Sequence, residues 1–193
     1  MRKTETLRII AGKWRSRKIT FAQAKGLRPT TDVARETLFN WIAGDVINAN
    51  CLDMFAGSGA LGFEALSRGA NSSTFIDSAP KVILKLKENA KLLGAENAEF
   101  FIAAMPKDLT KIAIKNKFNI IFIDPPFYQN LIAPTCQKLN NSDYFTNDTL
   151  VYIEAEKELS ISKIIPENWQ LLRQKSFGKT TSYLFQLHRD RIA

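Results

Sequence analysis

The sequence predicts an α/β fold in which a mostly parallel β-sheet carries helices on both of its faces. Short apolar segments with the length of buried strands alternate along the chain with segments of helical periodicity. A glycine-rich loop at residues 57–62 connects one such strand to one such helix. Three aspartates, Asp53, Asp77 and Asp124, each follow a predicted strand or end it. Because the carboxyl ends of parallel strands share one edge of the sheet, we expect these carboxylates to lie near a single ligand site.

The first 28 residues are strongly basic. They contain nine Lys or Arg side chains and one acidic side chain, and their net charge of +8 equals that of the whole chain. Apolar side chains are interleaved with these charges, so residues 7–12 and 14–21 are predicted to form a β-hairpin with a basic face. Such a ribbon suits a nucleic-acid backbone, and nonspecific surface charge is the alternative. The side chains expected to contact nucleic acid are Arg8, Lys13, Trp14, Arg15, Arg17, Lys18 and Arg28.

The remaining elements follow from apolar periodicity. A helix is predicted at 31–43, after Pro29 and with polar residues at its cap. Strands are predicted at 51–56, 73–76, 99–102, 118–123 and 149–154. Helices are predicted between them, one ending near residue 68 and the others at 81–93, 109–114 and 131–139. This alternation predicts parallel pairing with right-handed crossovers. Residues 169–176 and 180–188 are predicted to form an antiparallel pair of edge strands.

The glycine-rich loop predicts a site for an adenosine-containing cofactor. Gly57, Gly59 and Gly62 form a G-x-G-x-x-G pattern between a strand and a helix. Glycines permit a tight turn and a close approach of the backbone to a ligand, and amides at a helix start favour an anionic group. Asp77 lies twenty residues after Gly57, where a carboxylate can accept both hydroxyls of a ribose. The pattern fits a dinucleotide as well as other adenosine cofactors.

A second motif follows the strand at 118–123. Asp124, Pro125, Pro126 and Phe127 form a stiff turn, because each proline fixes its own φ and has no N–H. The Asp124 carboxylate and a main-chain carbonyl can each accept an N–H of an exocyclic amine on a nucleobase, while Phe127 stacks on the base. The alternative is a proline-rich turn in which Asp124 caps the next helix and Phe127 joins the core.

In this order, the motifs resemble those of S-adenosylmethionine-dependent methyltransferases that modify exocyclic amines. Residues 28–40, RPTTDVARETLFN, are similar to the signature of the RsmD family, and the resemblance covers nearly the whole chain. That family implies a Rossmann-like class I methyltransferase fold with a seven-stranded sheet, a basic hairpin extension at 1–28 and a methyltransferase domain at 29–193. It also implies methylation of a guanine N2 in small-subunit (16S) ribosomal RNA, either naked or within an assembling subunit.

The resemblance implies a role for each motif residue. Asp124, the Pro125 carbonyl and Phe127 are expected to position the amine and the base for catalysis. The cofactor is expected to contact Asp53, Phe55, Ala56, Gly57, Ser58, Gly59, Asp77 and Arg35. Residues 103–105, Ala-Ala-Met, lack the acid that often holds the adenine amino group in methyltransferases. We therefore expect backbone and apolar contacts to the adenine.

Composition excludes several other classes of protein. The two cysteines, Cys51 and Cys136, form neither a disulfide framework nor a metal-ligand spacing, and His188 is the only histidine. We therefore expect no metal and no histidine-based catalytic triad. No apolar run approaches membrane-spanning length, and the N-terminus lacks the apolar core of a signal peptide. We expect a cytoplasmic monomer that does not bind membranes.

Alternative functions remain open at this point. The same chemistry could act on adenine N6 in DNA or on a glutamine side chain of a protein. A nicotinamide-dependent oxidoreductase could use the same glycine loop, but it leaves residues 124–127 and the basic hairpin unexplained. A noncatalytic RNA-binding assembly factor could retain a vestigial pocket, although every expected reactive position is occupied.

Overall fold

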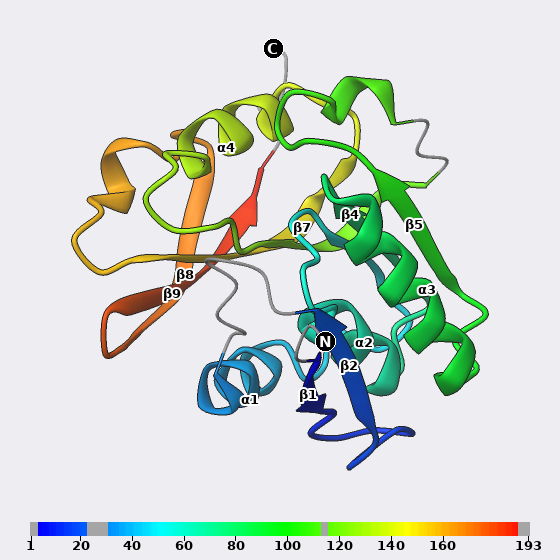
Figure 1. Ribbon diagram of the computed structural model, residues 1–193. Helices are drawn as coiled ribbons and strands as arrows, with labels where there is room; N and C mark the ends of the chain where they lie inside the picture. The colour runs from blue at the N-terminus through cyan, green and yellow to red at the C-terminus, as the bar shows by residue number, and fades with distance from the viewer. Residues whose placement is uncertain (1–3, 23–30, 113–115, 189–193) are drawn as a thin grey trace.

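A seven-stranded sheet forms the centre of the computed structural model, which describes residues 4–22, 31–112 and 116–188 (Figure 1). The strand order is β5-β4-β3-β6-β7-β9-β8. The parallel strands are β3 (Asn50–Asp53), β4 (Ser72–Asp77), β5 (Ala98–Ile102), β6 (Phe118–Ile123) and β7 (Phe145–Glu156). The last two strands, β8 (Trp169–Phe177) and β9 (Thr180–Leu187), pair antiparallel. The predicted mostly parallel, Rossmann-like sheet is confirmed.

Helices cover both faces of the sheet, as predicted. One face carries α1 (Asp32–Trp41), α2 (Ala60–Ser67) and α3 (Pro80–Leu93), and the other carries α4 (Ile132–Asn140) with the short 3₁₀ turns η1 (Leu109–Lys111) and η2 (Ile161–Lys163). Side chains of β6 alternate between the two layers: Ile120 and Phe122 join the first core, while Ile121 and Ile123 join the second. Among the described residues, no helix is both long and apolar enough to span a membrane.

Two predicted elements differ from the structure by more than their boundaries. The helix expected at 109–114 is only the single turn η1 within the described residues, and residues 113–115 lie outside them. Leu109 and Ile112 are both buried, so one turn is enough to place the apolar side chains of this segment. The second difference is that β9 lies between β7 and β8, so of this antiparallel pair β8 is at the edge of the sheet and β9 is not. β9 is interior because it pairs with the long strand β7 from Leu150 onward.

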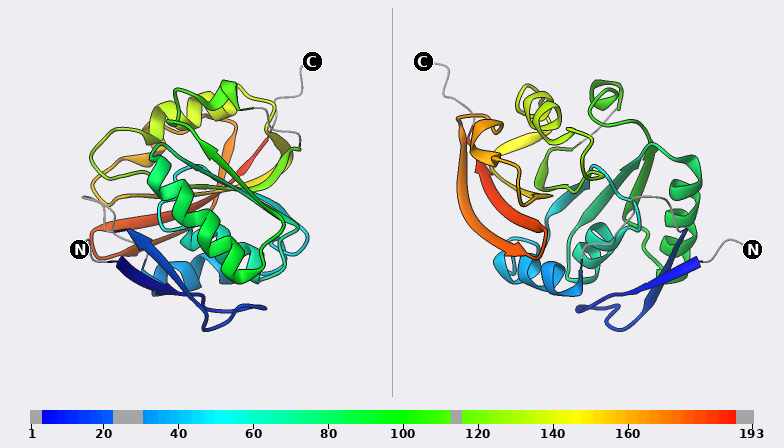
Figure 2. Two further views of the ribbon diagram at one scale, coloured as in Figure 1. Left: turned by 45° about the vertical axis from the view of Figure 1, so that its right-hand side comes forward. Right: turned by 60° about the vertical axis from the view of Figure 1, so that its left-hand side comes forward.

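The basic N-terminal segment forms the predicted hairpin with shifted boundaries. Its strands are β1 (Thr4–Arg8) and β2 (Lys18–Ala22), which pair antiparallel, and residues 9–17 connect them. Figure 2 shows the hairpin on the same side of the sheet as α1, α2 and α3. Leu7, Ile9, Ile19 and Phe21 are buried and belong to the core cluster on that face. The hairpin is therefore packed into the structure by its apolar side.

The connection between β1 and β2 is anchored to α2 by buried polar groups. The Glu64 carboxylate is fully buried and accepts the Ile10 N–H at 2.8 Å and the Ala11 N–H at 3.0 Å. The Ser67 carbonyl accepts the Lys13 N–H at 2.8 Å. A Cβ on Gly12, where φ is +81°, would lie only 1.8 Å from that carbonyl oxygen. The connection could not approach α2 this closely with another residue at position 12.

Candidate active site

The glycine loop joins the end of β3 to the start of α2. Gly57 and Gly59 have φ angles of +48° and +78°, a region that favours glycine. A Cβ on Gly59 would also lie 2.5 Å from the Leu86 side chain and 2.7 Å from that of Phe63. The loop is tied to both neighbouring strands, because Met54 N–H donates to Phe122 O on β6 and Ala56 N–H donates to Ile76 O on β4. The loop is thus held at the carboxyl edge of the sheet.

Asp53 lies beneath the glycine loop. Its side chain is 2% exposed, and Oδ2 accepts the Gly62 N–H of α2 at 3.2 Å. Burial raises the pKa of this carboxyl to about 7, the Gly62 N–H opposes the rise, and the charge of Asp77 adds to it. The Asp53 carboxyl therefore links the end of β3 to the first turn of α2.

The raised pKa of Asp53 predicts a specific pH dependence of stability. An unfolded aspartate has a pKa of about 3.9, so between about pH 4 and about pH 7 the folded chain keeps a proton that the unfolded chain loses. The free energy of unfolding should fall through this range by up to about 1.4 kcal/mol per pH unit. The Asp53→Asn variant keeps a carbonyl acceptor for Gly62 but cannot titrate, so its slope should be flatter. Urea unfolding across this range tests the difference, and equal slopes would contradict it.

Asp77 ends β4 and faces the glycine loop. Its Oδ2 accepts the Gly57 N–H at 3.0 Å, and its Oδ1 accepts the Ala79 N–H at 2.8 Å. The carboxylate is half-buried, so it is fixed by the backbone and still accessible. A carboxylate beside a tight glycine loop at a strand end has the chemistry required to bind ribose hydroxyls. The site therefore fits a cofactor that contains adenosine.

The segment after β5 lies next to Asp77, because β5 pairs with β4. Ala103 and Met105 are buried, while the Ile102 side chain is 58% exposed, which leaves an apolar surface at the end of this strand. An acid that the sequence analysis did not consider is also present: Asp108 Oδ2 accepts the Ala104 N–H at 3.0 Å, and Oδ1 pairs with Lys111 at 2.7 Å. The hydrogen bond from Lys111 holds the pKa of Asp108 below its usual value.

The turn at residues 124–127 follows β6 directly. Asp124 is half-buried and Pro125 is buried, whereas the half-buried Phe127 ring packs edge to face against Tyr128 at 6.5 Å between centroids. Asp124 does not cap the next helix, because α4 begins at Ile132 and its N-terminus has no side-chain cap. The alternative interpretation of this motif as a helix cap with a core phenylalanine is therefore wrong. Since β6 pairs with β3, the turn lies beside the glycine loop.

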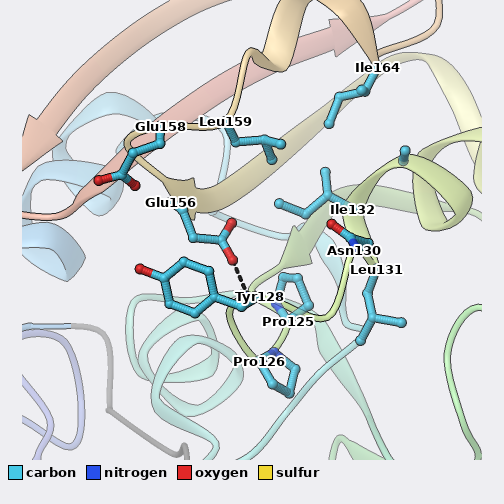
Figure 3. Close-up of a pocket in the computed structure, with 11 residues that line it drawn as sticks. Pro125, Pro126, Tyr128, Asn130, Leu131, Ile132, Glu156, Glu158, Leu159 and Ile164 are labelled. Atoms are coloured by element: carbon cyan, nitrogen blue, oxygen red, sulfur yellow. Dashed lines mark hydrogen bonds between the residues drawn. The ribbon is translucent and has the colours of Figure 1, made fainter.

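A cavity of about 330 Å³ opens on one side of this turn (Figure 3). It lies between the turn, the start of α4 and the segment that follows β7. Its walls are mostly apolar, with two carboxylates, those of Glu156 and Glu158, among them. The lining residues are Pro125, Pro126, Tyr128, Asn130, Leu131, Ile132, Ala133, Glu156, Glu158, Leu159 and Ile164.

Glu156 and Tyr128 were missed by the sequence analysis. Tyr128 has φ of +59° and a side chain that is 76% exposed, and its N–H donates to Glu156 Oε1. This contact joins the turn to the end of β7 across 28 positions of sequence. A left-handed tyrosine and a charged residue at a strand end carry no local pattern that indicates such a contact. Only the adjacency of β6 and β7 in the sheet brings the two residues together.

Arg35 was predicted to contact the cofactor, and the structure gives it other partners. Its side chain has no exposed surface. Its Nη2 donates to Arg8 O on β1 at 2.9 Å and pairs with Asp32 Oδ1 at 2.7 Å. The guanidinium therefore links α1 to the hairpin, and we omit it from the proposed cofactor contacts.

The predicted nucleic-acid contacts divide into exposed charges and one buried ring. Exposed basic residues on the hairpin are Arg8, Lys13, Arg15, Arg17 and Lys18. The Trp14 side chain is only 6% exposed and belongs to the core, with the Lys13 ammonium 4.4 Å from its ring centroid. The ring cannot stack on a base in this position, because its faces are occupied by protein. Arg28 lies outside the described residues.

Comparisons with known proteins found similarity over nearly the whole chain. Residues 7–186 match the family described as Conserved hypothetical protein 95. The Ribosomal RNA small subunit methyltransferase D of Buchnera aphidicola subsp. Acyrthosiphon pisum is 42% identical over 185 residues, 95% of each chain. The solved structure of the putative methyltransferase yhhF from Escherichia coli is 41% identical, with a TM-score of 0.83 over 96% of this chain and 100% of its own. The Thermus thermophilus 16S rRNA N2 G1207 methyltransferase RsmC, solved with AdoMet and guanosine, shares the fold, with a TM-score of 0.72 and 18% identity over 97% of this chain and 50% of its own.

Proposed function

Since the chain belongs to the Conserved hypothetical protein 95 family, the RsmD family, we propose that it methylates ribosomal RNA at the exocyclic N2 of a guanine in the small subunit. Its methyl donor is S-adenosylmethionine. The observation that carries the proposal is the placement of the turn at 124–127 on β6, next to the glycine loop on β3. This adjacency supports a site for an amine beside a site for an adenosine cofactor.

We assign the cofactor contacts to the groups at the ends of β3 and β4. Asp77 binds the ribose hydroxyls, and the backbone at Gly57 and Gly59 allows close approach of the cofactor. Phe55, Ala56 and Ser58 form the remaining surface of this loop. Asp53 acts through the loop, because its carboxylate is buried and bonded to Gly62. When bound, S-adenosylmethionine supplies an electrophilic methyl group on a sulfonium, so no metal is required.

The turn at 124–127 orients the guanine amine. Asp124 accepts one N–H of the amine and offsets the positive charge that develops on N2 during methylation. The Pro125 carbonyl accepts the second N–H, and Phe127 stacks on the base and fixes its plane. The amine loses one proton in the overall reaction, and the Asp124 carboxylate is the group at the turn that can accept it. Positioning of this kind can contribute several kcal/mol, up to about 7–11 kcal/mol in well-oriented reactions.

The hairpin provides the contacts to the RNA backbone. Arg8 and Lys18, which pair across the hairpin, alternate with the buried side chains Leu7 and Ile19 and so lie on the opposite face, while Lys13, Arg15 and Arg17 are exposed on the connection between the strands. Arg17 donates to Leu92 O on α3 at 2.6 Å, so the hairpin and α3 form one continuous surface. Contacts to phosphates are independent of base identity, and they release counterions.

A double variant, Arg15→Ala with Lys18→Ala, should weaken RNA binding and reduce its dependence on salt. Each lost phosphate contact lowers the slope of log affinity against log salt by about 0.7–0.9. The two side chains together should therefore lower it by about 1.4–1.8. Filter binding to small-subunit RNA over a range of salt concentrations measures this slope. Lys117→Ala, at the amino end of β6, is the control and should leave the slope unchanged; an unchanged slope in the double variant would remove these residues from the interface.

The function itself is tested by transfer of labelled methyl groups. Small subunits that lack their native modifications, and naked RNA from them, are incubated with the protein and labelled S-adenosylmethionine, then digested to nucleosides. We expect label in N2-methylguanosine. Label in another nucleoside, or none with either substrate, would contradict the proposal and direct the assay to DNA and to protein glutamine.

A further inference from the structure

The cavity beside the catalytic turn contains a carboxylate that the proposed mechanism does not use. Glu156 lines this cavity at the end of β7, where it is half-buried. Pro125, whose carbonyl is assigned to the guanine amine, lines the same cavity. Because Pro125 belongs to both the turn and the cavity wall, a base whose amine bonds to the Pro125 carbonyl can direct its adjacent edge toward Glu156. The cavity volume of about 330 Å³ is within the range of small-ligand sites and accommodates a purine ring.

The Glu156 carboxylate is held in one orientation. Its Oε1 accepts the Tyr128 N–H, which fixes the carboxylate relative to the turn. The second carboxylate oxygen, Oε2, has no hydrogen-bond partner within residues 4–22, 31–112 and 116–188. Figure 3 shows the carboxylate among Tyr128, Leu159 and Ile132, with one oxygen bonded to the tyrosine backbone and the other directed away from that bond. One acceptor is thus presented between apolar walls.

A fixed acceptor at this position distinguishes the purines by their hydrogen-bonding edge. Guanine has an N1–H donor adjacent to its N2 amine, whereas purines with an unprotonated N1 present a lone pair there. A carboxylate gains a charge-assisted hydrogen bond from the first and is repelled by the second. The acceptor therefore suits guanine and disfavours adenine-like bases.

We propose that Glu156 Oε2 accepts the N1–H of the target guanine and selects this base among the purines. The proposal rests on the proposed function, since it places the N2 amine of the same base at Asp124 and Pro125. Glu156 is a specificity residue that reads the edge adjacent to the reacting nitrogen. Tyr128 takes part only through its main-chain N–H, which holds the carboxylate in place.

The test replaces the acceptor by a donor. In Glu156→Gln, the amide oxygen can keep the Tyr128 N–H while the amide NH₂ faces the cavity. The matching substrate change is 2,6-diaminopurine, which keeps the N2 amine but has an acceptor at N1. Small subunits are assembled with guanine or 2,6-diaminopurine at the one position found to be methylated, and kcat/KM is measured for both. Glu96→Gln, an exposed position after α3, makes the same charge change outside the cavity.

The wild type and Glu96→Gln should prefer guanine by about 10- to 100-fold, the value of one hydrogen bond to a charged group. Glu156→Gln should lose this preference or reverse it. A general loss of activity with an unchanged ratio would show a structural role and overturn the proposal. An unchanged ratio with full activity would overturn it as well. If the wild type methylates no guanine at all, the proposed function itself fails. This outcome differs from the two above, in which the wild type is active and only the effect of Glu156→Gln is contrary to expectation.

Discussion

Replacement of Asp124 by alanine should lower the rate of methyl transfer by about 10²–10⁴-fold, the usual contribution of a positioned acid or base. The affinity for S-adenosylmethionine should stay close to that of the wild type. The carboxylate lies on the turn after β6, whereas the proposed cofactor contacts are on the loops after β3 and β4. We therefore expect the substitution to remove the proposed acceptor for the amine and to leave the proposed cofactor site intact.

Single-turnover kinetics and calorimetric titration of S-adenosylmethionine measure the two effects of the Asp124 substitution separately. Asp124→Asn sharpens the result: its carbonyl still accepts an N–H but cannot take a proton. If Asp124→Asn keeps part of the methyl-transfer rate and Asp124→Ala does not, Asp124 acts by orienting the amine. If both variants lose the same fraction of the rate, Asp124 acts by removing the proton. Asp45→Ala, an exposed position after α1, is the control. A normal rate in Asp124→Ala would exclude both roles.

Replacement of Glu64 by alanine should cost about 3 kcal/mol of folding stability. The variant leaves the Ile10 and Ala11 N–H groups without their acceptor, and it removes the partner of Arg68, whose Nε lies 2.7 Å from Glu64 Oε1. The carboxylate is fully buried, so water cannot replace it without opening the contact between the hairpin and α2. We expect the hairpin to detach before the sheet unfolds.

Urea unfolding and hydrogen exchange of the hairpin amides measure the consequence for Glu64→Ala. The affinity of Glu64→Ala for RNA should fall together with the stability of its hairpin, although this variant removes no exposed cation. Glu64→Gln is the intermediate case, because its amide oxygen can accept one of the two N–H groups. Glu96→Ala serves as the exposed control. Wild-type stability and exchange in Glu64→Ala would show that the apolar contacts of the hairpin suffice.

The sequence predicted those parts of the fold and site that depend on neighbouring residues. Apolar periodicity located β6 and α3 nearly to the residue, because each element must bury one side or both. The glycine loop and the turn at 124–127 could be located because glycine and proline indicate special backbone conformations within a few positions. The predicted helix at 109–114 was wrong because a three-residue spacing of buried side chains also fits a single turn.

Contacts between distant residues were not predictable in this way. Glu64 reads as one more polar residue of a helix, yet it is fully buried by a hairpin that lies more than fifty positions earlier. Trp14 reads as an exposed aromatic among cations, yet it packs into the core. Glu156 meets Tyr128 only because β6 and β7 are neighbours. In each case the sheet order, which a single sequence does not contain, decides the contact.

The short helix α2 carries the glycine loop at its start and the hairpin anchors Glu64 and Ser67 further along. Its eight residues span about 12 Å as a rigid rod. The basic hairpin and the proposed methyl-donor site are thus attached to the two ends of one short helix, which fixes the distance between them. If the hairpin binds RNA phosphates as proposed, we expect the target nucleotide to be selected by its distance from those phosphates in the folded RNA, so that a change in this distance excludes a target whose own sequence is intact.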